Sequence, residues 1–419
     1  MRYPIQLSCW LRPRQRQFGW TRNTSVVTDG TKPKPLAAIP GPSGLSALPY
    51  IGLMFELKPF TNYDVKKLSE LFEKYREQYG PLVKIRAGKD WLVCVYDPDD
   101  IAAVFRTESR HPYRGVTPLA KTYDRRKGVR PGLVTLVCEN YIDDALTKVN
   151  NTTNFHDATV QNPEIQSWNT KQSFDADVQN TQHPTNVNTT DMEDSLLFDL
   201  LSTPGMTPDM TRRILVDVFV AGIDSTANAM TFLFYFLAKH QDKQRKLYQE
   251  LLDVIPKDGK ITEDVIKKLS YLKACVKESL RLVFPICAGT ARILDLDIVL
   301  KGYKVPKGTT LVLCNGIICR EERYFPQQDQ FLPERWIRGD IRTDVNPFAH
   351  LPFGFGPRKC IGQRVAELEI YICTAKMFMT YRFKLPPGVD EIPYKYCTFA
   401  TPREKTTFML ERRVTTWHS

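Results

Sequence analysis

The stretch of sequence that decides the fold is Phe353-Gly354-Phe355-Gly356-Pro357-Arg358-Lys359-Cys360-Ile361-Gly362. Its glycines and its proline disfavour a continuous helix or strand, so we expect a loop. An amphipathic helix is predicted to follow at once, because apolar residues recur on one face at three-to-four spacing: Val365, Leu368, Ile372 and Ala375. Cys360 then stands at a helix N-terminus, where unsatisfied backbone N–H groups and the helix dipole favour thiolate over thiol.

A thiolate in such a loop suits the role of an iron ligand. Arg358 can offer a bidentate fork to a carboxylate on whatever the sulfur holds. Gly356 and Gly362 permit backbone angles and close approaches that a side chain would block. These features are typical of a site for iron in a porphyrin that carries propionates. The alternative interpretation of a lone cysteine such as Cys360 is a small hydrophobic residue in the core.

The spacing F-x-x-G-x-R-x-C-x-G weighs against that alternative, because five fixed positions recur by chance in only ~10⁻⁴ of chains this long. The stretch resembles the haem-ligating loop of the cytochrome P-450 superfamily, the haem-thiolate monooxygenases. The resemblance implies a mainly α-helical fold with a small β-sheet region, and haem b as the cofactor. It makes Cys360 the axial ligand of the iron and assigns Phe353, Gly356, Gly362 and Arg358 to haem binding.

The composition of the chain indicates which classes of partner it can bind. The chain has 419 residues, a net charge of +11 and a pI near 9.0, which suits acidic proteins and anionic membrane surfaces. Beyond the N-terminus, Lys and Arg are interleaved with acidic residues, so we expect no nucleic-acid partner. Ten scattered cysteines without a C-x-x-C pair favour reduced thiols in an intracellular compartment.

The chain is expected to form one haem-thiolate domain behind a targeting segment. Residues 1–28 contain five arginines and no acidic residue, which is typical of a mitochondrial transit peptide; a disordered basic tail is the alternative. The predicted organisation is a transit peptide and linker at 1–35, an N-terminal part of the domain at 36–136, a short helix with an Asn/Thr/Gln-rich loop at 137–194, and the haem-binding core at 195–419.

Residue patterns predict the main elements of this domain. One helix is expected to end at Tyr79, and a second to run from an Asp97 cap to about Arg106. Further helices are expected at residues 208–240, 241–254 and 263–269. Strands are expected at 82–86, 91–96, 299–305, 310–314 and 406–410.

The middle of the chain departs from the family. Residues 137–195 contain no W-x-x-x-R, the motif whose Trp and Arg hold a propionate in the family. Residues 150–194 are rich in Asn, Thr, Gln and Asp, and they are too poor in apolar residues to offset chain entropy. We therefore expect a disordered loop and an incomplete P-450 fold whose central helices are missing. Residues 114–136 match the family's substrate-contacting loop.

A second motif lies inside the predicted helix 208–240. Ala221-Gly222-Ile223-Asp224-Ser225-Thr226 puts glycine, an acid and two hydroxyls in a helix interior, where they weaken its hydrogen bonds. A kink at a packing contact would explain them; so would room for a small ligand with a proton relay through Asp224 and Ser225 or Thr226. The segment resembles the family's oxygen-activation segment, with Ser225 in the place of its threonine.

Charged residues complete the set of candidate site residues. Glu278 and Arg281 meet on one helix face at i and i+3, which alone indicates a surface ion pair. The family resemblance makes them a buried pair joined by Arg335. It assigns Lys273 and Lys277 to docking of an acidic ferredoxin, against the alternative of a solvated helix face.

Two further assignments come from the resemblance. Arg292 would hold a haem propionate, against the alternative of an ordinary surface arginine. Residues 286–290 and 398–401 would line the substrate pocket.

The resemblance implies a monooxygenase of the mitochondrial matrix, associated with the inner membrane. It would insert one atom of O₂ into a steroid-like or xenobiotic substrate, with electrons from NADPH through a ferredoxin reductase and the ferredoxin. Two alternatives stay open. One is a shortened, inactive form with weak or no haem binding, and the other is a microsomal enzyme that has lost its membrane anchor.

Overall fold

The computed structural model describes residues 32–63, 68–109, 196–203, 208–337, 345–396 and 399–413. Residues 1–28, predicted to be a transit peptide, residues 114–136, predicted to be a substrate-contacting loop, and residues 150–194, predicted to be a disordered loop, lie outside the described residues. The chain divides into two compact units, residues 1–19 with 126–223 and residues 20–125 with 224–419. Of the first unit, the structure describes helix α8 (Leu196–Leu201) and the start of helix α9 (Pro208–Lys239).

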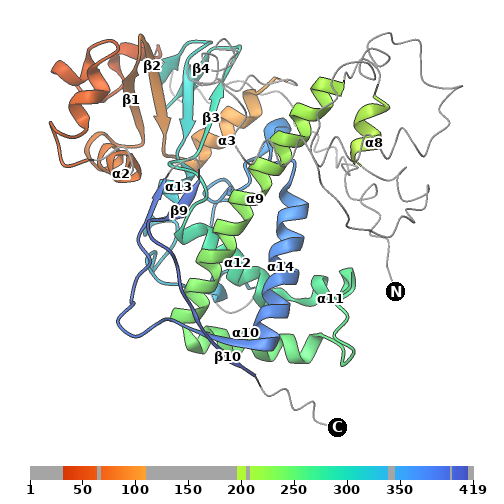
Figure 1. Cartoon of the computed structure of the whole chain (residues 1–419). Coiled ribbons are helices and arrows are strands. Elements are labelled where there is room, and N and C mark those ends of the chain that lie inside the picture. The colour runs from red at the N-terminus through yellow and green to blue at the C-terminus, as the bar shows by residue number, and fades with distance from the viewer. Residues whose placement is uncertain are drawn as a thin grey trace, which may run out of the picture. The chain divides into compact units, whose positions relative to one another are not determined.

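The second unit contains the other helices and all the strands of the described residues (Figure 1). Its α-helices are α2 (Leu68–Tyr79), α3 (Pro98–Thr107), the C-terminal half of α9, α10 (Gln241–Val254), α11 (Glu263–Lys268), α12 (Ser270–Leu282), α13 (Asn315–Ile318) and α14 (Gln363–Thr380). Short 3₁₀ helices are η1 (Leu36–Ala38), η2 (Gly44–Ala47), η3 (Gly52–Glu56), η6 (Pro333–Trp336) and η7 (Gly356–Arg358).

The strands form one sheet of four strands and three two-stranded ribbons. The sheet has the order β1 (Leu82–Ala87), β2 (Asp90–Val95), β6 (Thr310–Leu313), β3 (Thr290–Ile293); β2 and β6 are parallel and the other pairs antiparallel. The ribbons are β4 (Ile298–Leu300) with β5 (Tyr303–Val305), β7 (Tyr381–Lys384) with β10 (Met409–Arg412), and β8 (Tyr394–Tyr396) with β9 (Ala400–Pro402). Mainly helical architecture with small sheets was predicted from the sequence, and it is confirmed.

Local signals explain where several elements begin. The Asp97 carboxylate accepts hydrogen bonds from the backbone N–H groups of Asp99 and Asp100, so α3 starts at Pro98 as predicted. Helix α10 has the predicted bounds and α9 ends one residue short of them. The last strand is the exception, since β10 begins at Met409 rather than at residue 406; its pairing with β7 sets its start.

The helical core of the second unit is formed by α9, α10, α12 and α14. The rings of Phe234 on α9 and Phe378 on α14 lie 5.3 Å apart between centroids. The C-terminal ends of these two helices lie close together, because Gln241, just after α9, donates to the carbonyl of Phe383, just after α14, at 2.8 Å. The two helices therefore run in the same direction, side by side in Figure 1.

Helix α9 is long and apolar enough over Ile214–Lys239 to cross a membrane, judged by length and composition only. Its C-terminal half nevertheless contributes Phe232, Leu233 and Leu237 to the buried core. A core helix of a soluble protein passes the same test, so we treat α9 as part of the globular fold.

The buried face of α14 differs from the predicted one. Ile370, Thr374, Ala375 and Phe378 are buried, whereas Val365 in the first turns is 44% exposed. Helix packing covers only the later turns of α14. The apolar side chain nearest the cysteine loop is left at the surface.

Three charged residues are buried together where α12 meets η6. Two of the three guanidinium nitrogens of Arg281 donate to Glu278, Nε to Oε2 at 3.0 Å and Nη2 to Oε1 at 2.9 Å. Arg335 donates from Nε to Oε1 of Glu278 at 3.0 Å. The side chains of Glu278 and Arg281 are 0% exposed, so this is not the surface pair that spacing alone suggested.

The two arginines also donate hydrogen bonds to backbone carbonyls. Arg281 donates to the carbonyls of Cys319, Gln328 and Gln330, and Arg335 to that of Pro326. Glu278 also accepts from the indole of Trp336 at 2.8 Å. One carboxylate thus fixes residues 319–336, which otherwise contain little regular structure, against α12.

We predict that Glu278→Gln lowers the free energy of unfolding by about 3–5 kcal/mol, because two buried guanidinium groups lose their only counter-charge in this network. Urea unfolding followed by circular dichroism measures the change. Lys267→Ala, which removes surface ion pairs to Glu263 and Asp264, is the control and should leave the urea midpoint almost unchanged. Equal effects of the two substitutions would contradict the role given to Glu278.

Candidate functional site: the cysteine loop and the neighbouring pocket

The cysteine loop is a tight turn that leads into α14. The N–H of Cys360 donates to the carbonyl of Phe353 at 2.8 Å, which closes the loop on itself. Gly354 and Gly356 have φ of 71° and 75°, a left-handed conformation that favours glycine. Cys360 lies three residues before Gln363, the first residue of α14, as the sequence predicted.

Cys360 is exposed, and among the cysteines in the described part of the chain it alone is. The interpretation of this residue as a small hydrophobic core side chain is therefore wrong. Apolar side chains around it are also uncovered: Phe355 is 41% exposed and Ile361 83%, and Val365 lies nearby on α14. A Cβ added at Gly362 would have nothing within 4 Å. A thiol with an apolar, uncovered surround fits a large flat apolar group bound through sulfur.

Arg292 lies on β3 beside the loop and is 1% exposed, so it is not an ordinary surface arginine. Its Nη2 donates to the carbonyl of Phe355 at 3.3 Å, and its Nε forms an ion pair with the Glu108 carboxylate. The guanidinium also lies over the ring of Phe105. The site thus has a buried cation at the loop, as predicted for a propionate partner, but in this structure a protein carboxylate occupies it.

Glu108 is a residue that the sequence did not single out. A Cβ added at Gly356 would lie 2.9 Å from its Oε2, so Glu108 packs directly against the cysteine loop. No sequence pattern pointed to it, because its partner Arg292 is far along the chain. Arg358, the other predicted partner of a propionate, is exposed on the loop itself.

His350 joins the loop to the buried charge network. Its imidazole lies 4.9 Å from the ring of Trp336, which donates to Glu278. Burial lowers the pKa of His350 to about 3, and the nearby charges of Arg281 and Lys277 act in the same direction. The imidazole is therefore neutral at physiological pH, and its ring packs against Trp336 of the network.

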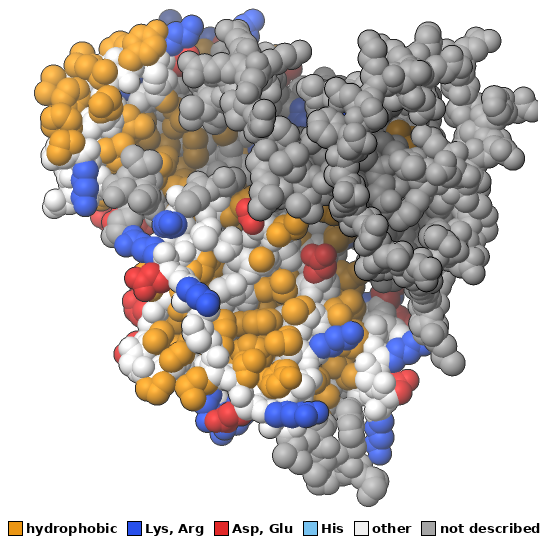
Figure 2. Space-filling model, in the orientation of Figure 1, with side chains coloured by type: hydrophobic (Ala, Val, Ile, Leu, Met, Phe, Trp, Pro, Cys, Tyr) orange, Lys and Arg blue, Asp and Glu red, His pale blue; other side chains and the backbone are white. Residues whose placement is uncertain are grey.

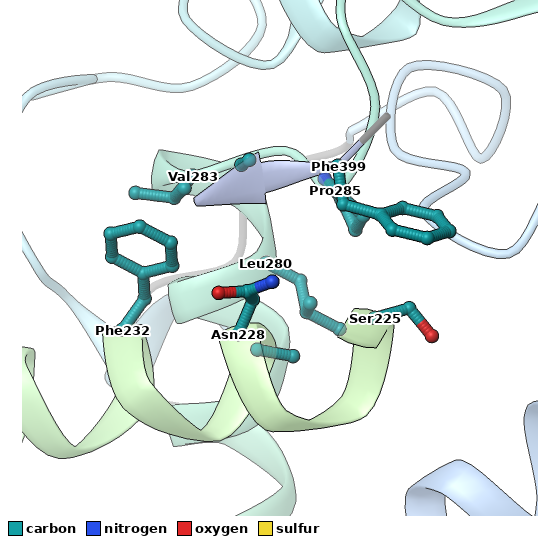
Figure 3. Close-up of a pocket in the computed structure, with 9 residues that line it drawn as sticks. Ser225, Asn228, Phe232, Leu280, Val283, Pro285 and Phe399 are labelled. Atoms are coloured by element: carbon teal, nitrogen blue, oxygen red, sulfur yellow. The ribbon is translucent and has the colours of Figure 1, made fainter. Parts of the chain in front are cut away.

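A pocket lies between α9, the end of α12 and β9 (Figure 3). Its lining residues are Ser225, Asn228, Ala229 and Phe232 from α9, Leu280, Val283 and Pro285 from α12 and the residues after it, and Phe399 with Ala400. Its empty volume is about 220 Å³ with open solvent included, but the space that a water-sized molecule can occupy is about 10 Å³, room for about one water. Phe399 and Ala400 belong to the predicted pocket stretch 398–401, of which residue 398 lies outside the described residues, whereas the stretch 286–290 contributes none of these lining residues.

The three predicted relay residues occupy different positions on α9. Ser225 lines the pocket, on the helix face that it shares with Asn228 and Phe232 at i, i+3 and i+7. Asp224 is exposed, and Thr226 is 5% exposed and is not among the pocket-lining residues. Of the two hydroxyl-bearing residues, Ser225 is the one that lines the pocket, and in Figure 3 its hydroxyl points away from Phe232 and Leu280.

The two lysines assigned to a redox partner lie on α12. Lys277 is exposed, and its ammonium group lies 5.7 Å from the centre of the Trp336 ring. Lys273 donates to the carbonyl of Lys267 at 2.9 Å, and partial burial lowers its pKa. Lys277 is therefore the more accessible of the two cations.

The chain matches a known protein family. The sequence profile of the cytochrome P450 family matches residues 42–131 and 151–410. The chain belongs to the cytochrome P450 family. Its second matched block begins at residue 151, within the stretch that was expected to fall outside the resemblance.

Similar curated proteins are cytochromes P450 of insects. "Probable cytochrome P450 12d1 proximal, mitochondrial" of Drosophila melanogaster is 39% identical over 212 residues, which cover 50% of this chain and 38% of that protein. "Probable cytochrome P450 12a5, mitochondrial" of the same species is 42% identical over 178 residues, or 40% and 33% of the two chains. "Cytochrome P450 CYP12A2" of Musca domestica is 37% identical over 187 residues, or 42% and 35%. In each case the match spans less than two fifths of the relative's length.

Membership of the P450 family implies a haem-thiolate cofactor, and the described residues fit it on the sulfur side. Cys360 is accessible, and Phe355, Ile361 and Val365 offer an uncovered apolar surround. On the carboxylate side, Arg358 is exposed on the same loop, and Arg292 would have to be shared with Glu108.

Two glycines of the loop provide a matched pair for testing its conformation. We predict that Gly356→Ala lowers the free energy of unfolding by about 1–2 kcal/mol or more, because the residue is left-handed and a Cβ would meet Glu108. Gly362→Ala should change it by less than about 0.5 kcal/mol, since its φ is −82° and the space around it is open. Denaturant unfolding of the protein without added haem measures both, and similar costs would contradict the loop geometry.

Proposed function

We propose that this chain is a haem-thiolate monooxygenase. The observation that carries the proposal is Cys360, an accessible thiol at the entry to α14 within the loop motif of its family. The sulfur would hold the haem iron, and Arg358 together with Arg292 would neutralise the propionates.

When bound, the haem supplies reductive activation of O₂: one oxygen atom enters a C–H bond of the substrate and the other leaves as water, with two electrons and two protons consumed. The chain itself contributes the surroundings. Ser225 lines the pocket, and Asp224, one residue earlier on α9, is a solvent-exposed acid that would pass protons through the Ser225 hydroxyl. Phe232, Leu280 and Phe399 exclude water and favour a lipophilic substrate, of a steroid-like or xenobiotic class.

Electrons would come from an acidic ferredoxin, itself reduced by an NADPH-dependent reductase. The exposed ammonium group of Lys277, with Lys273 one turn earlier, supports docking of an acidic protein on α12. The mitochondrial names of two relatives and the arginine-rich, acid-free residues 1–28 support action in the mitochondrial matrix.

The main test is the spectrum of the reduced protein under carbon monoxide. We predict that the full chain, produced with a haem precursor, shows the red-shifted Soret band of thiolate-ligated haem. Cys360→Ser should abolish the band, because a hydroxyl does not replace the thiolate donor. Cys373→Ser, on the same helix α14, is the control and should keep it.

The contrary outcome has a specific structural reason. A chain that takes up no haem would support the inactive, shortened form, in which Glu108 keeps Arg292 for itself. If the shortened central part is what prevents haem binding, Glu108→Gln should not restore the band. Recovery of the band in Glu108→Gln would instead identify the ion pair as the obstacle.

We also propose that the second unit contacts the inner membrane through an apolar surface formed by η2, η3 and the following turn. Leu45, Tyr50, Ile51, Met54 and Phe60 are each 46–73% exposed. Figure 2 shows apolar side chains gathered at the upper left, where Figure 1 places this N-terminal part of the unit. Exposed lysines lie beside the apolar residues: Lys58 is close in sequence to Phe60, and Lys89 follows Gly88, whose carbonyl accepts from the N–H of Tyr50. An apolar surface with basic neighbours fits an anionic bilayer.

We predict that the protein floats with vesicles that contain anionic lipid, and that Ile51→Glu with Met54→Glu weakens this binding about tenfold or more, because two apolar anchors become charged. Leu410→Glu, an exposed apolar position on β10, is the control and should bind like the unchanged protein. Equal losses for both variants would remove the case for this surface.

A further inference from the structure

We propose that Glu108 is an internal stand-in for a haem propionate: its carboxylate fills an anion site at Arg292 in the haem-free chain and leaves that site when a propionate binds. This inference rests on the haem site of the proposed function and adds a residue to it. Glu108 caps the C-terminal end of α3 and Arg292 lies on β3, so only the folded chain brings the two together.

The Glu108 side chain has the same chemistry as a haem propionate. From its Cα it carries two methylene groups and a carboxylate, and a propionate carries the same group from the porphyrin ring. Its Oε1 accepts from Nε of Arg292 in an ion pair whose two side chains are each 1% exposed. A carboxylate of propionate length therefore already lies at the buried cation beside the cysteine loop.

Arg292 is also held by contacts that do not involve Glu108. Its Nη1 donates to the carbonyl of Ala291 at 2.9 Å, and its Nη2 donates to the carbonyl of Phe355 at 3.3 Å. The guanidinium lies 5.2 Å from the centre of the Phe105 ring. Carbonyls and an aromatic ring orient the guanidinium but do not neutralise it, and a buried charge needs a counter-ion. The anion site therefore persists when Glu108 leaves, and another carboxylate can take it.

The cysteine loop leaves room for the carboxylate at Gly356. A Cβ built there would lie 2.9 Å from Oε2 of Glu108, so any other residue would crowd this oxygen. Cys360 follows four residues later in the same loop. A group that is held by the Cys360 sulfur and carries carboxylates thus competes with Glu108 for one place.

The exchange of one carboxylate for another is close to balanced, because either one keeps the buried guanidinium paired. Glu108 has the advantage of its attachment to the chain, which acts as a high effective concentration against a free carboxylate. Its backbone is outside the helical range (φ −56°, ψ 136°), so its withdrawal does not unwind α3. Removal of the Glu108 charge should therefore destabilise the haem-free chain and strengthen haem binding, two effects of opposite sign.

Acetate tests the anion site without haem. Glu108→Ala removes the side chain beyond Cβ, a fragment that acetate matches in size and charge. The thermal unfolding midpoint of this variant should lie below that of the unchanged chain. Sodium acetate should raise it by about 1–2 °C or more relative to sodium chloride at equal ionic strength. The unchanged chain should show no such difference, since Glu108 fills the site.

A second ion pair between arginine and glutamate provides the matched control. Glu321→Ala removes the carboxylate that bonds to Nε of Arg76 at 2.9 Å, in a pair whose side chains are 19% and 18% exposed. Water reaches that guanidinium, so acetate should not stabilise the Glu321→Ala variant.

Haem titration tests the displacement. Haem is added to the full chain and its uptake is followed by Soret absorbance. Glu108→Gln keeps the size of the side chain and removes its charge, so the propionate no longer competes with an attached carboxylate. The dissociation constant should fall about fivefold or more. The dimethyl ester of haem, whose propionates carry no charge, should bind the unchanged chain and Glu108→Gln equally.

The outcomes separate this inference from the proposed function. Weaker haem binding by Glu108→Gln would mean that Glu108 orients Arg292 for the propionate, and it would overturn the proposal. So would a Glu108→Ala variant that acetate does not stabilise; if that variant does not fold, the titration of Glu108→Gln decides alone. No haem uptake by either form would contradict the proposed function together with the displacement, and the acetate measurement would still show whether Glu108 fills an anion site.

Discussion

The buried carboxylate of Glu278 is the constraint on which the rest of the site depends. A charge with no solvent exposure is tolerated only when every oxygen is paired, and Glu278 accepts from Arg281, Arg335, Trp336 and the N–H of Leu332. These donors lie on both α12 and the irregular segment 319–336, so the pairing joins the two. Trp336 then packs against His350, at the start of the cysteine loop. Satisfying one charge therefore also positions the backbone from which Cys360 is presented.

A second buried ion pair, Arg292 with Glu108, packs against the cysteine loop. Here the physical situation differs, because the carboxylate comes from the end of α3 and the arginine also donates to the loop carbonyl of Phe355. An arginine buried at 1% exposure needs an anion, and a protein carboxylate meets that need in the structure as it stands. A propionate at this point would compete with Glu108 for one guanidinium. If Arg292 is a propionate partner, as proposed above, haem binding requires that this competition be resolved in favour of the propionate.

The sequence predicts features that depend on residues close together in the chain better than features that depend on residues far apart. The bounds of α3 and α10 and the turn at the cysteine loop follow from caps, proline and glycine, which act within a few residues. The burial of Glu278 and Arg281 does not follow from such local signals, because spacing at i and i+3 is the same on a surface and in a core. The family resemblance predicted it. Glu108 and Asn228 left no sequence signal at all. Their partners, Arg292 and Thr401, are brought to them only by the folded chain.

Helix α9 carries a local side-chain hydrogen bond beside the pocket-lining residues. Ser225 and Asn228 are one turn apart on the same face, and Asn228 holds the carbonyl of Asp224, the acid next to Ser225 in the chain. That bond is an ordinary side-chain bond to the i−4 position, which competes mildly with the helix ladder. Gly222, Asp224 and the hydroxyls of Ser225 and Thr226 likewise weaken or compete with the hydrogen bonds of a helix interior. Residues 221–228 are therefore a stretch of α9 that helix propensity alone does not favour.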